Sequence, residues 1–160
     1  MPRTLLVALD DGARSDDLIR LACDLAGVEG RVIALAVTPV HPSLPLLGLP
    51  AVIDQRARDA LRRAQDLARC HGYVIETRMR RGRSVARVIV LQAHCVEADA
   101  ILLGLASPRF SWLAPRLSRT ARDVLREAPC PVLLEHYPDG DTLRASEAVA
   151  EAERVLGHAS

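Results

Sequence analysis

Lysine is absent from this sequence, and so are several sequence motifs that are typical of common enzyme and binding-protein classes. All 21 basic residues are arginine. Reactions that need a Schiff-base lysine are therefore excluded, as is the Gly-Lys-Ser/Thr phosphate loop. Aromatic residues make up only 2% of the chain and the formal net charge is +1. The chain as a whole therefore lacks the charge that attracts nucleic acid or acidic lipid.

Long apolar runs are also absent. Hydrophobic residues form 49% of the 160-residue chain, but no run reaches the ~18 consecutive apolar residues of a membrane-spanning helix. The N-terminus, Met1 to Thr4, leads directly into an apolar segment and lacks the small-residue cleavage site of a secretory signal. The length suits one domain with one sizeable core. We therefore expect a cytoplasmic protein.

Closely spaced metal or disulfide ligands are missing as well. No Cys-x-x-Cys pair occurs, and each cysteine falls within or beside an apolar segment, which predicts reduced, mostly buried thiols. The histidines are too scattered to suggest a metal site, and no His-Glu-x-x-His occurs. The residues concerned are Cys23, Cys70, Cys95 and Cys130, and His41, His71, His94, His136 and His158.

Other catalytic and binding motifs are absent too. There is no Gly-x-Gly-x-x-Gly after the first apolar run and no Gly-x-Ser-x-Gly. Asp10 and Asp11 are adjacent, so their side chains point apart on an extended chain, and Asp11 is interpreted as a turn residue. The densest basic patch has no interleaved aromatics, so no nucleic-acid partner is expected. It consists of Arg78, Arg80, Arg81 and Arg83.

Short aliphatic runs alternate with segments of helical periodicity along most of the chain. This order predicts an α/β fold with parallel strands and right-handed crossovers. The alternating segment 73–77 is typical of a strand at a sheet edge. We expect strands at 5–9, 32–37, 73–77, 100–103 and 132–135, and helices at 16–26, 51–71, 85–94 and 118–128.

The connections carry recognisable start and stop signals. Ser15 is the expected N-cap of the first helix, with Asp16 and Asp17 in its first turn, and Gly27 is its expected terminator. The segment 38–50 contains four prolines and is expected to be irregular. The tail, residues 138–160, is expected to be an extension of the domain formed by residues 1–137, with an amphipathic helix at 143–156.

Three stretches resemble the universal stress protein family. Leu6-Val7-Ala8-Leu9-Asp10 is similar to the family's opening strand, and Gly82-Arg83-Ser84-Val85-Ala86 to the turn that enters its third helix. The third stretch runs from Ala98 to Leu134 and closes on Ala128-Pro129-Cys130-Pro131-Val132. The similarity spans Thr4 to Glu135 and leaves the tail outside.

The resemblance implies a fold and two properties. The fold is a three-layer, Rossmann-like open sheet with strand order 3-2-1-4-5. The domains of this family commonly dimerise through the last strand, here Val132 to Glu135, which implies a homodimer. Members of the nucleotide-binding type bind ATP or AMP over the carboxyl ends of the strands, so an adenine nucleotide is the implied cofactor.

Nucleotide-binding members carry Gly-x-x-Gly, nine residues, and then Gly-Ser or Gly-Thr after the fourth strand. Here the first glycine is Gly104, the second position is Ser107 followed by Pro108, and the third is Leu117; only Ser118 keeps the final hydroxyl. Glycines let backbone amides reach phosphates, and the hydroxyl lies at a helix N-terminus that favours anions. Two of the three glycines are therefore replaced.

The remaining candidate contacts have two interpretations. Asp10 and Val37 match the ligand contacts of the family's first and second strands, but both also suit a plain strand end. Arg109, Arg116 and Arg119 lie in or beside the altered loop, where guanidinium groups can hold an anion or simply be solvated. The loop also contains Phe110 and Trp112, which suit a lid or a subunit contact.

These observations leave three functional hypotheses. The first is a non-catalytic stress-response or regulatory binding domain that forms a homodimer and for which ATP binding is doubtful. The second is an adenine-nucleotide-binding member, with a slow ATPase activity left open. The third is an interaction module for a transporter or a kinase, contacted through residues 39–50 and the tail.

Overall fold

The structure, a computed structural model, describes residues 3–9, 15–43, 51–105 and 117–136, with the backbone alone at 51–53. A single parallel sheet in the order β3-β2-β1-β4-β5 organises these residues, as predicted. Its strands are β1 (Thr4–Leu9), β2 (Arg31–Pro39), β3 (Glu76–Gly82), β4 (Ala100–Gly104) and β5 (Val132–Glu135). The helices are α1 (Ser15–Ala26), α2 (Ala51–Cys70), α3 (Val85–Cys95) and α4 (Arg119–Glu127).

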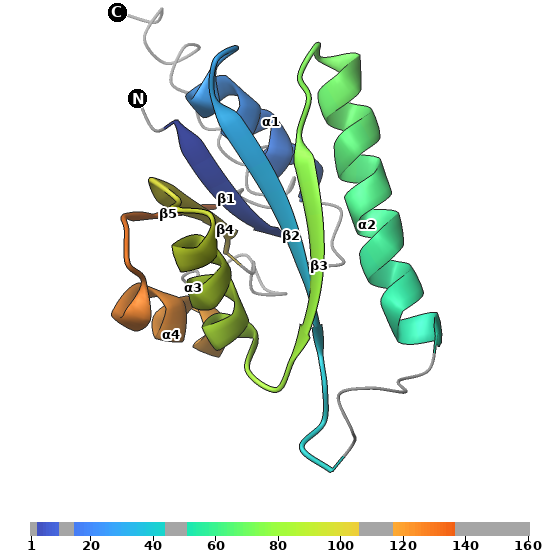
Figure 1. Cartoon of the computed structure of the whole chain (residues 1–160), viewed down its shortest axis with the longest axis vertical. Helices are drawn as coiled ribbons and strands as arrows, with labels where there is room; N and C mark the ends of the chain where they lie inside the picture. The colour runs from blue at the N-terminus through green and yellow to red at the C-terminus, as the bar shows by residue number, and fades with distance from the viewer. Residues whose placement is uncertain (1–2, 10–14, 44–50, 106–116, 137–160) are drawn as a thin grey trace, which may run out of the picture.

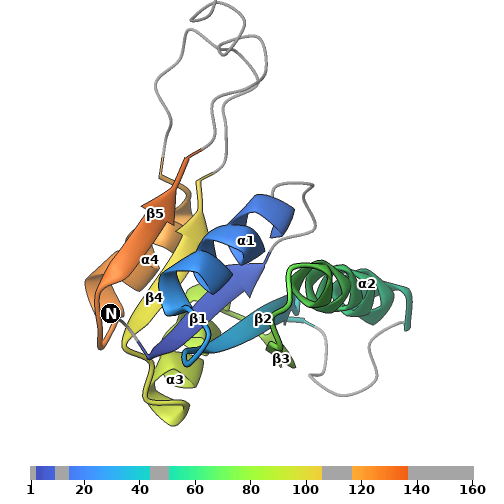
Figure 2. The ribbon, with the colours of Figure 1, turned by 90° about the horizontal axis from the view of Figure 1, so that it is seen from above.

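Helices cover both faces of the sheet, α1 and α2 on one and α3 and α4 on the other (Figures 1 and 2). Alternate residues of the central strands supply the two cores: Leu5 and Val7 point toward α1 and α2, and Leu6 toward α3 and α4. These three side chains have no exposed surface. Burial on both faces explains why the central strands are continuous aliphatic runs.

Hydrogen bonds to the backbone and a glycine in a left-handed conformation set several element ends. Ser84 Oγ accepts the backbone N–H of Arg87 and caps α3. Gly27 follows α1 with a φ of +67°, a conformation that glycine adopts without steric cost. The Asp99 carboxylate accepts the backbone N–H groups of Arg3 and Thr4, both at 2.8 Å, and so fixes the start of β1 beside β4.

Several predicted boundaries are wrong by one or two residues. Ser15 is the first residue of α1, with its side chain buried, and is not the residue before the helix. β2 continues through Thr38 and Pro39, which were expected to be irregular. β4 includes Gly104, which was expected to follow it.

The predicted third strand is displaced along the chain. Residues 73–77 alternate in polarity, but β3 spans Glu76 to Gly82 and Val74 is 94% exposed before it. The strand is at the sheet edge, as expected, because it pairs with β2 alone within the described residues. An edge strand tolerates arginine at alternate positions, so hydrophobic alternation is a weak guide to its limits.

The cysteines are free, as expected, but the expectation that most are buried is wrong. Cys23 is buried within α1, and Cys130 is partly buried before β5. Cys70 and Cys95 are exposed because each occupies the last turn of a helix, α2 and α3 respectively. An apolar neighbourhood in sequence does not place a residue on the buried face of a helix.

Within the described ranges, no helix combines the length and apolarity needed to cross a membrane. Residues 44–50 of the segment predicted to be irregular, and the tail helix predicted at 143–156, lie outside these ranges. The boundary between the domain and its C-terminal extension at residue 138 therefore stays a prediction.

Candidate functional site

The carboxyl ends of the strands form one edge of the sheet, and the connections change direction there between β1 and β4. The chain leaves β1 for α1 on one face and leaves β4 for α4 on the other. Helices that diverge in this way open a crevice at the strand ends, the usual ligand position in open α/β sheets. All four helices also begin at this edge, so their positive dipole ends face it.

Two of the predicted contact residues flank the end of β1. The register pairs Leu9 with Ala36 and Ala8 with Leu103, so Val37 and Gly104 follow directly on the two neighbouring strands. The Val37 side chain is half-buried and packs toward α3 and α4. Gly104 is exposed, and a Cβ added there would make only an ordinary 3.7 Å contact with Leu18 Cδ1. Packing alone therefore does not require glycine at this position.

Ser118 begins α4 at the same edge. Its Oγ accepts the backbone N–H of Ala121 at 3.1 Å, so the hydroxyl acts as the helix N-cap. Leu117 directly precedes it with 39% of its side chain exposed. Arg119 follows it and is 91% exposed, with its guanidinium 3.9 Å from Asp123 in the next turn of α4. The start of α4 thus presents an apolar side chain beside the capping hydroxyl.

The remaining predicted contacts lie outside the described residues: Asp10, Ser107, Arg109 and Arg116. Phe110 and Trp112 lie outside them too. The structure therefore brings Val37, Gly104 and Ser118 to one edge of the sheet, while the contribution of the connecting loop stays a prediction.

A buried ion pair that the sequence analysis did not identify lies further along the same edge. Asp54, in the first turn of α2, is 1% exposed. Arg81 near the end of β3 reaches it with two guanidinium nitrogens, the Nε bond measuring 3.3 Å. Arg58, one turn along α2, lies 3.9 Å from the same carboxylate. The pair joins the start of α2 to the carboxyl end of β3.

This environment shifts the titration of both partners. The hydrogen bond from Arg81 lowers the pKa of the Asp54 carboxyl, although burial acts in the opposite direction; the charges of Arg81 and Arg58 and the Thr38 hydroxyl lower it further. The same hydrogen bond raises the pKa of Arg81. Asp54 is therefore ionised at neutral pH and acts as a fixed anion, not as a general acid.

A signal for Asp54 was present in the sequence. Asp54 shares one helical face with Ala57 and Leu61, both of which are buried, because residues three and seven apart lie on the same side of a helix. A carboxylate on an apolar face requires a cation. Arg81 was instead grouped with the exposed arginines around it, since its partner is 27 positions away.

Among the described side chains, no group of three or more His, Cys, Asp or Glu residues could hold a metal ion. Among the described residues, the groups at the carboxyl edge that suit an anion are the exposed backbone of Gly104, the capping hydroxyls of Ser84 and Ser118, and the helix N-termini. Such groups bind and orient anions.

Comparisons with known proteins agree on one family. Residues 1–136 match the model of the Universal stress protein family. A universal stress protein from Archaeoglobus fulgidus is 22% identical with a TM-score of 0.66, and the match covers 82% of this chain and 91% of that chain. A comparison with curated protein sequences finds no match.

Two further solved structures contain nucleotides by their descriptions. One is the universal stress protein from Archaeoglobus fulgidus in complex with dAMP, at 24% identity and a TM-score of 0.65, covering 82% of this chain and 95% of that one. The other is a universal stress protein in complex with cAMP, at 22% identity and a TM-score of 0.58, covering 84% and 97%. At these identities the structural matches establish the shared fold alone.

Proposed function

Because the chain belongs to the universal stress protein family over residues 1–136, we propose that it is a cytoplasmic, non-catalytic regulatory binding domain. Its working form is a homodimer joined through β5, and it does not depend on a bound nucleotide. The observation that carries this proposal is Leu117, a half-exposed branched side chain directly before the N-cap of α4. A phosphate that approaches the first amides of α4 must displace it.

The other groups at the start of α4 support the same proposal. The Ser118 hydroxyl is engaged by the backbone of its own helix, and Arg119 leans toward Asp123. Ser107 and Pro108 replace the glycine and an amide donor of nucleotide-binding members. Fewer donor groups are therefore available near the start of α4 to hold a phosphate.

A second candidate function, adenine-nucleotide binding, is favoured by a different observation. Gly104 is exposed at the carboxyl edge of the sheet although packing leaves room for a side chain there. Solved family members are described in complex with dAMP and cAMP. In this alternative a nucleotide lies over Asp10, Val37, Gly104 and Ser118, with Arg109, Arg116 and Arg119 as anion contacts.

A nucleotide titration separates the two candidates. We expect AMP, ADP, ATP and Mg-ATP, each at millimolar concentration, to change neither the melting temperature nor the emission of Trp112, the only tryptophan in the chain. Ligand at 100 times its dissociation constant would add ~2.7 kcal/mol of stability. The matched variant carries Ser107→Gly and Leu117→Gly, which restores two glycines and should gain a measurable shift. A shift in the parent protein would establish the second candidate.

The homodimer leads to a separate expected result. β5 pairs with β4 on one side only within the described residues, and Leu133 on it is 37% exposed. Unpaired aliphatic edge strands favour association. We expect sedimentation at micromolar concentration to give a dimer for the parent protein and a monomer for Leu133→Arg. The control Leu125→Arg changes a leucine of similar exposure (42%) on α4 and should stay dimeric; a monomeric parent would contradict the proposal.

A further inference from the structure

The face of β3 that points away from α2 is strongly basic. Thr77 accepts a hydrogen bond from Gln65 of α2 and Arg81 binds Asp54 of α2, so the odd-numbered side chains of the strand face that helix. Side chains alternate along a strand. Glu76, Arg78 and Arg80 therefore lie on the opposite face, on the side of the sheet that carries α3.

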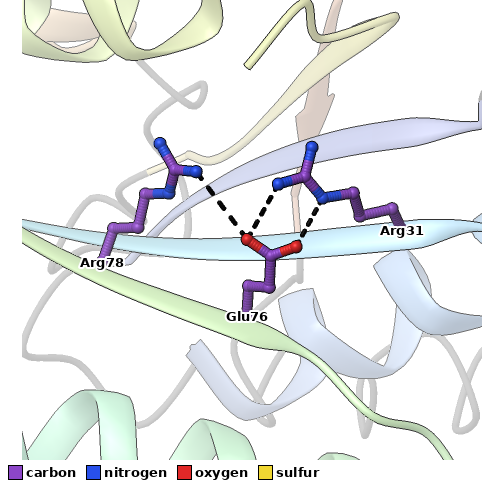
Figure 3. Close-up of polar contacts among 3 residues, drawn as sticks. All are labelled: Arg31, Glu76 and Arg78. Atoms are coloured by element: carbon purple, nitrogen blue, oxygen red, sulfur yellow. Dashed lines mark hydrogen bonds and ion pairs between the residues drawn. The ribbon is translucent and has the colours of Figure 1, made fainter. Parts of the chain in front are cut away.

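The carboxylate of Glu76 on this face interacts with two arginines. Glu76 accepts hydrogen bonds from Arg31 Nε at 2.5 Å and from Arg31 Nη2 at 2.9 Å. Arg78 approaches the same carboxylate only to 3.7 Å. Figure 3 shows the two arginines turned toward Glu76 from opposite sides. Arg31 thus takes the bidentate geometry, and Arg78 keeps donors that no described carboxylate satisfies. The three side chains together carry one net positive charge.

The segment that follows adds charge of the same sign. Residues 77–96 contain no aspartate or glutamate. Arg80 donates to the backbone carbonyl of Met79 at 2.9 Å, and Arg83 and Arg87 are exposed near the start of α3. Among the described residues, none of these three has a carboxylate within ion-pair distance. Arg78, Arg80, Arg83 and Arg87 are called the β3–α3 arginine face below.

β3 also has one unpaired edge in the described part of the sheet. The carbonyl of Gly82 accepts the Val40 N–H on the side of β2, and backbone groups alternate in direction along a strand of a parallel sheet. The N–H and C=O groups of Thr77 and Met79 therefore point to the edge that no described strand occupies. Arg78 and Arg80 stand beside that edge about 7 Å apart, the spacing of alternate residues in an extended chain.

We propose that the β3–α3 arginine face binds an extended acidic segment of a partner protein, aligned with β3. Carboxylates at alternate positions of such a segment match Arg78 and Arg80, and an acidic continuation reaches Arg83 and Arg87. A second copy of the same edge brings arginine against arginine and is repelled. A nucleic acid is disfavoured because the described residues of this face include no aromatic side chain on which its bases could stack.

This inference goes beyond the proposed function, since it concerns neither the β1–β4 crevice nor β5. The test uses the full chain and a labelled peptide of about ten residues in which threonine and glutamate alternate, so that the acids share one face when extended. A peptide of the same composition with its glutamates in one block is the matched probe. Binding is followed by fluorescence anisotropy at low ionic strength.

We expect the alternating peptide to bind about fivefold more tightly than the block peptide, and its affinity to fall as salt is added. The triple variant Arg80→Gln, Arg83→Gln and Arg87→Gln should bind about tenfold more weakly. The control triple variant Arg62→Gln, Arg63→Gln and Arg69→Gln removes the same charge from the exposed side of α2 and should bind like the parent. Both variants should keep melting temperatures within about 2 °C of the parent.

Three outcomes would overturn the proposal. An equal loss in the control variant would show that binding follows net charge and not this face. Equal affinity for the block peptide would show that the strand spacing does not matter. Tighter binding of a single-stranded oligonucleotide or of polyphosphate, lost in the first triple variant, would make the face a polyanion site. None of these results depends on the nucleotide titration or on the oligomeric state.

Discussion

The Asp54→Asn variant is expected to melt about 5–10 °C below the parent protein at pH 7. Asp54 is 1% exposed and receives two guanidinium contacts from Arg81. An amide keeps the shape but removes the anion, so the 30%-exposed Arg81 side chain loses its ion pair with the Asp54 carboxylate. Thermal unfolding followed by circular dichroism at neutral pH measures the difference.

The pH dependence of stability, compared between the parent protein and Asp54→Asn, should report the ionisation of Asp54. The folded-state pKa of Asp54 is lowered, so the ionised carboxyl stabilises the native state at every pH above the unfolded value of about 3.9. That contribution is lost as the pH falls through the folded-state pKa. The difference in melting temperature between the parent and Asp54→Asn should therefore be constant between about pH 5 and pH 8. It should become smaller below about pH 4.

Asp59→Asn is the matched control for this prediction. Asp59 lies in the same helix, but its side chain is 48% exposed and Arg62 approaches it only to 3.9 Å. Exposed pairs of this kind contribute little, so its melting temperature should stay within about 2 °C of the parent. An Asp54→Asn protein as stable as this control would contradict the inference that the Asp54–Arg81 ion pair stabilises the packing of α2 on β3.

The Leu102→Ala variant is expected to lose about 3–4 kcal/mol of unfolding free energy. Leu102 lies in β4 with 1% of its surface exposed, paired with Val7 of β1 and Leu133 of β5. Its side chain is part of the core beneath α1 and α2. Truncation removes buried methyl groups and leaves a cavity that two flanking strands prevent from collapsing.

Denaturant titration of Leu102→Ala and Leu91→Ala tests this expectation. Leu91 lies in α3 with 60% of its surface exposed, so the same truncation should cost less than about 0.5 kcal/mol. The denaturant concentration at the unfolding midpoint should fall for Leu102→Ala and stay unchanged for Leu91→Ala. The slope of unfolding free energy against denaturant concentration should be the same in both variants. A loss below about 1 kcal/mol for Leu102 would mean that β4 is not packed on both sides as described.

The central strands could be predicted from the sequence because they are covered on both faces. The runs that begin at Leu5, Val32 and Ala100 are aliphatic throughout and became β1, β2 and β4 with small changes at their ends. β3 was predicted less well because one of its faces carries Glu76, Arg78 and Arg80. An open strand face imposes little selection for apolar residues.

The sequence predicted single residues of the candidate site but not how they are arranged in space. Val37, Gly104 and Ser118 were named from a resemblance, and the register of β1 with β2 and β4 places the first two beside the end of β1. The Asp54–Arg81 pair was missed because a sequence pattern does not report which helix covers which strand. That contact exists only once α2 packs across β2 and β3.

The amino-acid sequence was enough to predict the fold class and the strand order of the described sheet, because buried strands and amphipathic helices differ in hydrophobic periodicity and because three stretches resemble one family. Which charges are neutralised became known from the packing of the chain in three dimensions. The packing assigned Arg81 to a buried carboxylate and left Arg80, Arg83 and Arg87 without a described acidic neighbour. Charge pairing depends on distance in space, and a sheet brings together residues that the chain keeps far apart.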